Sequence, residues 1–413
     1  MDTHFDIVVI GAGVAGLTAT YTLQNEGFSV ALLEKTDRVG GRVKTDHHSG
    51  FLLDRGFQIF LPAYPEAQRM LNDDALDLNP FHSGAHIYQD DDPFLLYDPR
   101  RHPVLALQSL KNPAYRLNDL RLLMKLYADV RARSYESFFQ DPDKSTLSYL
   151  KSFGFRQEFI DRFFRPFFSG IFLDNSLETS SQLFLFLFQI FSSTTATLPT
   201  QGIEAISRQL EQSLDDGTVF TDTCVVNIEE NTIHTDQGKT FQARRMINAT
   251  NHSPGEPNQT TGSNSWNHTT CYYFSLESPP VSLPTLHLIA GSNPINSFCF
   301  PSLVQDSYSP DGKHLASVSS LWAPDRISHE IIKDELKQIF GDQIESWEFL
   351  RSYEIKQALP KFEPKTNYNP RNQPPVHNHL CRAGDSTTTP SLNGAMRSGR
   401  LAAEAIKTDL LRE

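Results

Sequence analysis

Cysteine is scarce in this chain of 413 residues, which contains only four: Cys224, Cys271, Cys299 and Cys381. They are scattered along the chain, and no two of them form a Cys-x-x-Cys pair. This spacing indicates neither a zinc site nor a disulfide framework, and it suits a reducing compartment. The histidines also lack the spacing of metal ligands, so the sequence predicts no metal site.

Excess positive charge and long apolar runs are missing as well. The formal net charge is −12 at pH 7, which argues against nucleic acid as a partner. The longest apolar run, Leu183 to Phe188, is too short to span a bilayer. The N-terminus shows no basic region followed by an apolar leader, because its first apolar run starts at Asp6 and leads straight into glycines. The sequence therefore predicts a cytoplasmic protein.

What the chain does contain is most distinctive in its first 42 residues. A short apolar run, Asp6 to Ile10, is followed at once by Gly11-Ala12-Gly13-Val14-Ala15-Gly16. A helical stretch from Leu17 to Glu26, a second apolar run from Phe28 to Leu33, and Glu34 come next. A strand, a glycine-rich turn, a helix, a strand and an acid at the second strand's end are typical of a dinucleotide-binding βαβ unit.

Each part of this pattern has a physical role. Gly11 permits the tight turn, Gly13 lets a pyrophosphate approach the backbone, and Gly16 lets the helix pack closely on the sheet. The helix N-terminus at Val14 offers free N–H groups and a positive dipole end to the phosphates. We expect Glu34 at a surface-facing strand end, where it can accept both hydroxyls of an adenosine ribose. The alternative is a glycine turn that holds no nucleotide.

Further helices and strands follow from the hydrophobic periodicity and the turn residues. The expected helices cover Arg116 to Phe139, Ile203 to Leu214, Ser328 to Phe340, and Asn393 to about Leu411. The expected strands cover Cys224 to Ile228, Thr232 to Thr235, Arg245 to Ala249, parts of 271–325, and a last strand ending at Arg382 to Asp385. A loop or linker is expected over Asn251 to Asn267.

At this length the chain exceeds one ordinary hydrophobic core, so two domains are expected. Patterns of βαβ type recur at both ends of the chain, while the middle differs. The fold class is therefore predicted as α/β, with a discontinuous Rossmann-like domain formed by residues 1–63, 198–255 and 353–413. An inserted α+β substrate-binding domain would comprise residues 64–197 and 256–352, with the active site between the two domains.

Several blocks in the same order resemble the superfamily of FAD-dependent amine oxidases, phytoene desaturases and protoporphyrinogen oxidases. Arg38 to Arg42 resembles its second phosphate-contact motif, and Phe51 to Gln58 resembles the segment that passes the flavin ring. Leu198 to Ile203 is similar to its Leu-Pro-x-Gly-Gly turn, although Ile203 replaces the second glycine. Ala383 to Asp385, followed by Asn393 to Gly399, resembles its C-terminal flavin motif.

This resemblance implies that the Rossmann-like domain binds FAD. The flavin is expected to be noncovalent, because no cysteine stands near Ser391 to Gly394. The candidate cofactor-binding residues are Gly11, Gly13, Val14, Ala15, Gly16, Glu34, Lys35, Gly40, Gly41, Arg42, Gly56, Phe57, Gln58, Val225, Ala249, Gly384, Asp385, Gly394, Ala395 and Met396.

Two of these candidates carry explicit alternatives. Asp385 is expected to accept hydrogen bonds from ribityl hydroxyls, and its alternative is a plain helix N-cap. Arg42 is expected to contact a phosphate, and its alternative is a solvated surface arginine. The N-terminus of the last helix, at Gly394 to Met396, can stabilise negative charge on a reduced flavin.

The sequence lacks a second dinucleotide fingerprint and a lysine in the expected place, and both absences bear on the reaction. The chain has one dinucleotide fingerprint, which favours direct oxidation of a substrate over reduction by NAD(P)H. In the amine oxidase branch, a substrate-domain lysine typically holds a water at the flavin, but this chain has no Lys or Arg between Met246 and Gly312. We therefore expect hydride abstraction from a small hydrophobic substrate of the polyene or porphyrinogen class, with reoxidation by oxygen or a quinone-like acceptor.

The alternatives are a flavin amine oxidase with a relocated base, and a redox-silent FAD protein that binds or isomerises a pigment. No catalytic residue is predicted.

An aromatic segment, 153–191, holds twelve of the 29 phenylalanines and admits three interpretations. The favoured interpretation is that these side chains form ordinary hydrophobic core. The other two are that they line an apolar substrate tunnel, or that they make peripheral contact with a membrane surface. Arg165 is expected to pair with a local acid, and Tyr273 either to face the flavin or to be a plain strand residue.

Overall fold

The computed structural model describes residues 4–56, 59–89, 94–97, 101, 116–252, 266–291, 293–322, 327–364, 369 and 372–412. The α-helices are α1 (Val14–Gln24), α2 (Ala67–Met70), α3 (Asp73–Leu76), α5 (Leu117–Arg131), α6 (Tyr135–Phe138), α7 (Thr146–Phe153), α8 (Gln157–Phe159), α9 (Arg165–Phe172), α10 (Ser181–Ser193), α11 (Glu204–Gln212), α12 (Pro301–Val304), α13 (His329–Phe340) and α14 (Leu392–Leu410). A π-helical turn, η1 (Ile160–Phe164), joins α8 to α9, and two 3₁₀ turns are η3 (Asp306–Tyr308) and η5 (Gly341–Ser346).

The strands are β1 (His4–Ile10), β2 (Val30–Leu33), β3 (Thr45–His48), β4 (Phe51–Asp54), β5 (Leu78–Pro80), β6 (Gly84–Tyr88), β7 (Phe94–Tyr97), β8 (Thr197–Pro199), β9 (Val219–Phe220), β10 (Val225–Glu229), β11 (Thr232–Thr235), β12 (Thr240–Asn248), β13 (Trp266–Leu276), β14 (Leu286–Ile289), β15 (Ser297–Cys299), β16 (His314–Ser320), β17 (Glu348–Pro360), β18 (Val376–His377) and β19 (Leu380–Arg382). Two large sheets contain most of them, and β3–β4 and β5–β8 form two small pairs.

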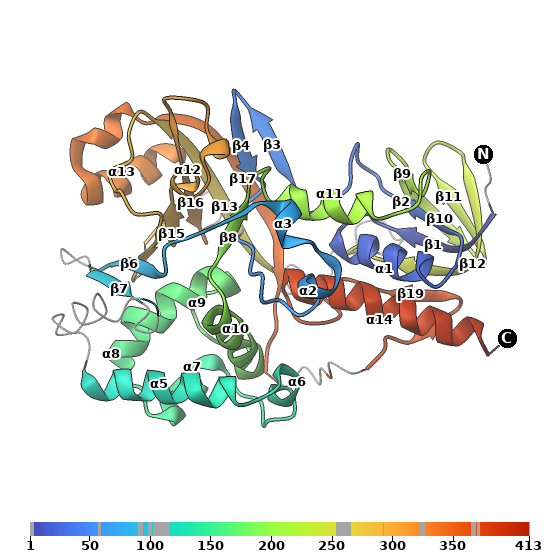
Figure 1. The fold of residues 1–413 in the computed structure, drawn as a ribbon, viewed down its shortest axis with the longest axis horizontal. Coiled ribbons are helices and arrows are strands. Elements are labelled where there is room, and N and C mark those ends of the chain that lie inside the picture. The colour runs from blue at the N-terminus through green and yellow to red at the C-terminus, as the bar shows by residue number, and fades with distance from the viewer. Residues whose placement is uncertain are drawn as a thin grey trace.

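The first sheet, at the right of Figure 1, has the strand order β10-β11-β12-β1-β2-β9, with β19 beside β12 and β18 beside β19. Strand β1 pairs in parallel with β12 and β2, so that Val8 lies opposite Met246 on one side and Ala31 on the other. All four residues of β2 are buried. Burial on both faces explains why the central strands are continuous apolar runs instead of alternating ones.

Helices α1 and α14 pack side by side against this sheet (Figure 1). A Cβ added to Gly399 of α14 would lie 2.1 Å from the carbonyl oxygen of Ala15, so a glycine is required for the two helices to approach this closely. The last helix of the chain is thereby fixed to the first. Segments about 385 residues apart in the sequence meet at one edge of the nucleotide-binding unit.

The second sheet, at the upper left of Figure 1, has the order β17-β13-β16-β15-β14-β6-β7. Most of its neighbours are antiparallel, and β14 with β6 is a parallel pair. Helix α13 covers one face, where Ile332 and Leu336 pack with Tyr272 and Phe274 of β13. Tyr272 and Tyr273 are both buried, and the hydroxyl of Tyr273 donates to the carbonyl oxygen of Asp54.

Helices α5 to α10 form a group at the lower left of Figure 1, and its centre is aromatic. Phe159, Phe164, Phe168 and Phe184 are each at most 1% exposed, and the ring centroids of Phe168 and Phe184 lie 4.7 Å apart. The favoured interpretation of the aromatic segment as core is confirmed. The local pairing expected for Arg165 is also confirmed, because its Nε donates to Asp161 over 2.9 Å.

Most predicted elements begin and end within five residues of the observed ones, and Thr232–Thr235 agrees in full. The helix expected over Arg116 to Phe139 is instead two helices, α5 and α6. Ser134 adopts an extended backbone with a ψ of 147°, which ends one helix and starts the next. The domain boundary expected at residue 353 falls inside β17, which pairs with β13 as far as Pro360.

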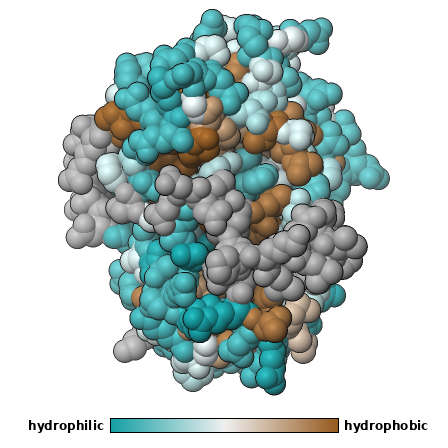
Figure 2. All heavy atoms as spheres, turned by 90° about the vertical axis from the view of Figure 1, so that its left-hand side faces the viewer, coloured by the Kyte–Doolittle hydropathy of each residue, from teal (hydrophilic) through white to brown (hydrophobic). Residues whose placement is uncertain are grey.

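Among the described residues, no helix is both long enough and apolar enough to cross a membrane. Figure 2 shows the face formed by the second sheet and the helical group, where apolar side chains are interspersed with hydrophilic ones. The large apolar side chains that are exposed on the described parts of the chain include Leu117 and Met124 of α5. Peripheral membrane contact stays a prediction.

Candidate FAD and substrate site

A cavity of about 1040 Å³ is lined by residues from both large sheets. This volume lies at the upper end of the range for small-molecule and cofactor sites. From the first sheet and its connections it is lined by Ile10, Gly11, Gly13, Val14, Ala15, Leu33, Glu34, Lys35, Gly40, Gly41, Arg42, Val43, Thr223, Cys224, Val225, Val226, Ala249, Thr250, Asn251, His252, Gly384, Asp385, Ser391, Leu392 and Ala395. From the second sheet, β4 and α9 it is lined by Arg55, Gly56, Gly170, Ile171, Leu173, Thr269, Asn296, Ser297, Ser319, Ile355, Gln357, Ala358 and Leu359.

The glycine turn between β1 and α1 has the predicted geometry. Gly11 has a φ of +95°, a conformation that favours glycine. A Cβ on Gly16 would lie 1.9 Å from the carbonyl oxygen of Gly11, so only glycine allows the helix to start this close to the strand. Gly13 is the N-cap of α1 and makes no side-chain cap, which leaves the first N–H groups of the helix directed at the cavity.

The two glycine motifs lie directly against each other. Gly13 and Gly40 form a parallel bridge, and the Gly40 N–H donates to the carbonyl oxygen of Ala12 over 2.8 Å. A Cβ on Gly41 would lie 3.1 Å from the Cα of Gly13. Gly40 and Gly41 also have φ values of +114° and +59°, which favour glycine, so bare backbone faces the cavity from both segments. Such a surface fits the close approach of a pyrophosphate.

Glu34 lines the cavity, but it does not face the surface as the sequence suggested. The side chain is 6% exposed. One carboxylate oxygen accepts from the N–H of Ala12 at 2.9 Å, and the other accepts from the N–H and the hydroxyl of Thr36 at 3.0 and 2.7 Å. Glu34 therefore fastens the glycine turn to the end of β2. The oxygen bonded to Ala12 keeps one acceptor position for a ribose hydroxyl.

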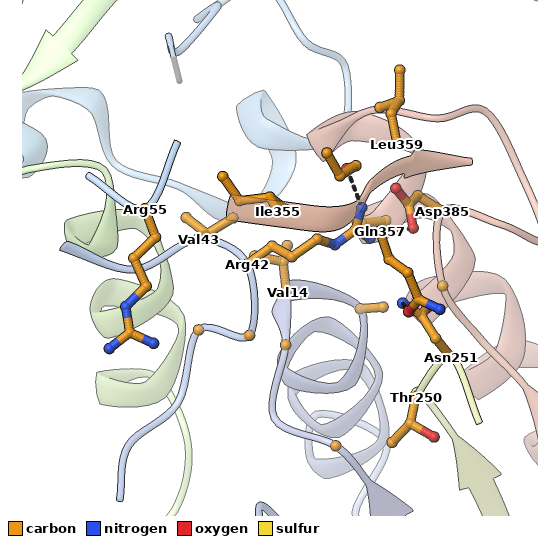
Figure 3. Close-up of a pocket in the computed structure, with 18 of the residues that line it drawn as sticks. Val14, Arg42, Val43, Arg55, Thr250, Asn251, Ile355, Gln357, Leu359 and Asp385 are labelled. Atoms are coloured by element: carbon orange, nitrogen blue, oxygen red, sulfur yellow. Dashed lines mark hydrogen bonds and ion pairs between the residues drawn. The ribbon is translucent and has the colours of Figure 1, made fainter. Parts of the chain in front are cut away.

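Arg42 and Asp385 form an ion pair at the cavity wall, and the Nη2···Oδ1 distance is 2.5 Å. The other guanidinium nitrogen, Nη1, donates to the carbonyl oxygen of Ala358 in β17 over 2.7 Å, as Figure 3 shows. Arg42 is thus a paired, partly exposed arginine and not a free surface one, and its contact with a phosphate stays a prediction. The N-cap alternative for Asp385 is wrong, because Ser391 caps α14 by accepting from the N–H of Gly394.

The N-terminal turn of α14 contributes unequally to the cavity. Ala395 lines it, together with Leu392 and Ser391. A Cβ on Gly394 would lie 1.7 Å from the carbonyl oxygen of Thr389, so this glycine is required for the turn that precedes the helix. Met396 is fully buried in the core. Gly394 and Met396 therefore shape and support the helix start, while Ala395 is the predicted residue of the three that faces the cavity.

The remaining candidates divide into three groups. Lys35, Val225, Ala249 and Gly384 line the cavity, as does Gly56 at the end of the β3–β4 hairpin. Gly16 supports the fold instead of facing the cavity. Two further predicted residues lie outside the described parts of the chain: Phe57 and Gln58.

Two acids of the β3–β4 hairpin, the buried Asp54 and the partly buried Asp46, hold it in place. Burial raises the pKa of Asp54 to about 6, against hydrogen bonds from Thr45, the N–H of Ile203 and Tyr308, which lower it. Partial burial also raises the pKa of Asp46, but hydrogen bonds from arginines and a tyrosine hold it well below its usual range. The donors to Asp46 are Arg55, Arg38 and Tyr353.

The turn at Leu198 to Ile203 tolerates the missing second glycine for a local reason. Gly202 has a φ of +78°, and a Cβ there would lie 2.4 Å from Thr45. Ile203 has an ordinary φ of −62°, and its N–H donates to Asp54. Only the first of the two positions therefore requires glycine.

The wall contributed by β13, β15, β16, β17 and α9 is uncharged. Among its described residues are the carboxamides of Asn296 and Gln357, hydroxyls at Thr269, Ser297 and Ser319, and apolar groups such as Ile171. The charged side chains and the histidine that line the cavity come from elsewhere: Glu34, Lys35, Arg42, Arg55, His252 and Asp385. Apart from Arg55, which follows β4, the charged groups lie on the nucleotide half, and the wall formed by β13, β15, β16, β17 and α9 is neutral.

Residues 14–407 match the model of a family described as flavin containing amine oxidoreductase. The chain belongs to this family. Its glycine-rich cradle, its buried Glu34 and the Arg42–Asp385 pair fit the phosphates and hydroxyls of FAD, the cofactor of the family's oxidoreductases. The superfamily resemblance of the sequence motifs is confirmed.

Two curated relatives illustrate the breadth of these flavin oxidoreductases. Polyamine oxidase 3 of Oryza sativa subsp. japonica is 51% identical over 49 residues, which are 12% of this chain and 10% of the relative. The chloroplastic/mitochondrial protoporphyrinogen oxidase 2 of Arabidopsis thaliana is 37% identical over 67 residues, which are 16% of this chain and 13% of the relative. These matches thus span only a small part of each relative.

Solved structures share the fold over all or nearly all of the chain. Putrescine oxidase bound to putrescine superposes with a TM-score of 0.72 at 17% identity, covering 100% of both chains. A protein from Pyrococcus furiosus superposes with a TM-score of 0.70 at 17% identity, covering 97% of both chains. The predicted α/β class is confirmed to this extent. At such identities the likeness extends to the fold alone.

Sequence analysis missed the neutral wall of the site. Ser297 and Ser319 stand in strands β15 and β16, Asn296 directly precedes β15, and no motif surrounds them. The polar link between Asn251 and Gln357, 3.2 Å long and visible in Figure 3, was also missed. Both depend on contacts between segments more than 100 residues apart in the sequence, which a linear pattern does not encode.

Proposed function

We propose that this flavoenzyme takes a hydride from a neutral, largely apolar substrate of the polyene or porphyrinogen class. The observation that supports it is the uncharged wall opposite the nucleotide half of the cavity. A protonated amine would need a carboxylate there, because a buried charge without a partner is strongly disfavoured. The described residues of that wall include neither an acid for such a substrate nor a lysine to hold a water.

The nucleotide half has assigned roles in this proposal. The backbone at Gly13 and Gly41 would hold the pyrophosphate, with the guanidinium of Arg42 as a charged donor. Glu34 would accept a ribose hydroxyl through the oxygen that also binds Ala12. Asp385 would accept from the ribityl chain, and Lys35, Val225 and Ala249 would surround the adenosine.

The flavin half of the site would work by position instead of by acid–base groups. FAD, when bound, accepts a hydride, and the substrate gains a double bond as a proton leaves to solvent. The N-terminus of α14 at Ala395 would stabilise negative charge nearby. The neutral wall, including Ile171 and Thr269, would hold the reacting C–H in place and exclude water. Oxygen or a quinone-like compound would then take up the electrons.

The second candidate function is amine oxidation, which the family description and the polyamine oxidase relative favour. It requires a base other than the missing lysine. The redox-silent alternative requires no electron transfer from substrate at all. The three candidate functions differ in which compounds, if any, reduce the flavin and so bleach its colour.

The deciding experiment is anaerobic mixing of the FAD-loaded protein with substrates of each class, followed by flavin absorbance. The proposal predicts rapid bleaching by a porphyrinogen or a polyene and none by putrescine or longer polyamines. Bleaching by the amines alone would replace it with amine oxidation. Retention of full flavin colour with every compound, although pigment binds, would favour the redox-silent function.

A further inference from the structure

Asn296 occupies a rigid position in the neutral wall of the cavity. It directly precedes β15 and is 6% exposed. Its N–H donates to the carbonyl oxygen of Ser319 over 2.9 Å, and its own carbonyl oxygen accepts from the N–H of Ile289 over 3.0 Å. The backbone on both sides is therefore fixed by sheet hydrogen bonds, and the side chain projects from a well-defined point.

The orientation of the Asn296 carboxamide follows from its neighbour. Nδ2 lies 2.7 Å from the hydroxyl of Ser169 in α9. That hydroxyl donates its only proton to the carbonyl oxygen of Pro166 over 3.2 Å, so toward Asn296 it can only accept. The group facing Ser169 is therefore the NH₂, and Oδ1 points the other way.

Oδ1 of Asn296 is buried and has no hydrogen-bond partner in the described structure. Buried acceptors are nearly always paired in proteins, because an unpaired one costs stability. Beside it lies Gly170, which also lines the cavity, and a Cβ at that position would lie 2.8 Å from Oδ1. Any side chain at position 170 would therefore press directly on this acceptor, and glycine leaves the space beside it free.

We propose that Asn296 is a specificity-determining residue that accepts a hydrogen bond from an N–H or O–H group of the substrate. The hydroxyls of Thr269, Ser297 and Ser319 line the same wall and suit a polar but uncharged part of a ligand. This inference rests on the proposed function and narrows it. A porphyrinogen presents pyrrole N–H donors, whereas a hydrocarbon polyene would leave Oδ1 unpaired.

The test uses the FAD-loaded protein and a matched pair of neutral aromatic ligands, carbazole and N-methylcarbazole. Binding is followed through the perturbation of the flavin absorption spectrum. The wild-type protein should bind carbazole at least roughly tenfold more tightly than its N-methyl counterpart, because only carbazole can donate to Oδ1. In Asn296→Leu, the ratio of the two dissociation constants should fall to about one.

Two further variants make the result independent of any folding defect in Asn296→Leu. Gly170→Ala keeps the carboxamide but covers Oδ1, so it should also reduce the ratio. Asn293→Leu replaces another asparagine, three residues before Asn296, whose Nδ2 donates to the carbonyl oxygen of Ala290. This variant should keep the wild-type ratio. A ratio near one in the wild-type protein, or a ratio that survives in Asn296→Leu, would overturn the inference. Because binding alone is measured, this outcome is separate from whether neutral substrates reduce the flavin.

Discussion

At the scale of single residues, Glu34 has two roles, one in the fold and one in binding the cofactor. It closes the glycine turn through Ala12, and it offers an acceptor to the ribose. Glu34→Gln should therefore weaken FAD binding by about tenfold or more, since both carboxylate oxygens accept from a backbone N–H, of Ala12 or of Thr36, and the amide places a donor against one of them. FAD content after purification and the dissociation constant of added FAD measure the effect.

The control for this variant is Asp37→Asn, which removes a nearby acid whose side chain is 72% exposed. It should retain wild-type FAD content. If Glu34→Gln also purified with full FAD, the placement of the adenosine ribose beside Glu34 would be wrong.

Asp385 and Arg42 form an ion pair, so substitutions of either residue should have similar effects on FAD affinity. Asp385→Asn and Arg42→Gln should each lower FAD occupancy, by about tenfold in dissociation constant. The double variant should lose less than the sum of the two changes, because groups in direct contact are coupled. A double-mutant cycle on FAD affinity provides the measurement. Unchanged affinity in Asp385→Asn would count against its ribityl assignment.

The predictable part of the site is the part encoded by local backbone constraints. Gly11 and Gly16 are predictable because a positive φ and a close helix–strand contact demand glycine whatever surrounds them. The burial of Glu34 was not predictable, since it depends on Thr36 and Ala12 folding back over the carboxylate. The neutral wall at Asn296 depends on strand packing and carried no motif at all.

At the scale of elements, the buried aromatic group of α8 to α10 should contribute to stability as core does. Phe168 is 1% exposed and contacts the rings of Phe164, Phe172 and Phe184. Phe168→Ala should lower the free energy of unfolding by about 3–5 kcal/mol, the usual cost of such a cavity. Denaturant unfolding of the variant gives the value.

The same variant should bind FAD normally, because Phe168 does not line the cavity. A variant of undiminished stability that had lost binding of apolar ligands would instead support the tunnel. Phe153, which is partly exposed at the edge of the group, provides a milder comparison.

Asp54 links three elements, β4, α11 and η3, and it should make stability depend on pH. Its folded pKa of about 6 lies above the ordinary value of 3.8, so the folded state holds the proton more tightly than the unfolded chain. The contribution of Asp54 to the free energy of unfolding is therefore complete below pH 3.8 and is lost as the pH rises through about 6.

Asp54→Asn mimics the protonated acid and should remove this dependence. Urea unfolding of both proteins at several pH values between 4 and 7 would show the variant gaining stability relative to wild type as the pH rises. A difference that stays constant across this range would mean that Asp54 does not carry the raised pKa.

At the scale of the whole molecule, the order of the motifs predicted the α/β class and the nucleotide-binding unit. The α1–α14 contact through Gly399 explains why a C-terminal motif serves a site that begins at residue 11. The place of β17 was not predictable, because a strand that starts at Glu348 and runs to Pro360 crosses the expected domain boundary. Its long pairing with β13 decides the sheet to which it belongs.

The central claim is that one cavity between the two sheets holds noncovalent FAD against a neutral wall. Its most direct test is the visible absorption spectrum of the protein purified without added cofactor, before and after acid precipitation. We predict flavin bands in the native protein and release of all the colour into the supernatant. A protein that stays colourless after FAD is added, or a flavin that remains with the precipitate, would contradict the account.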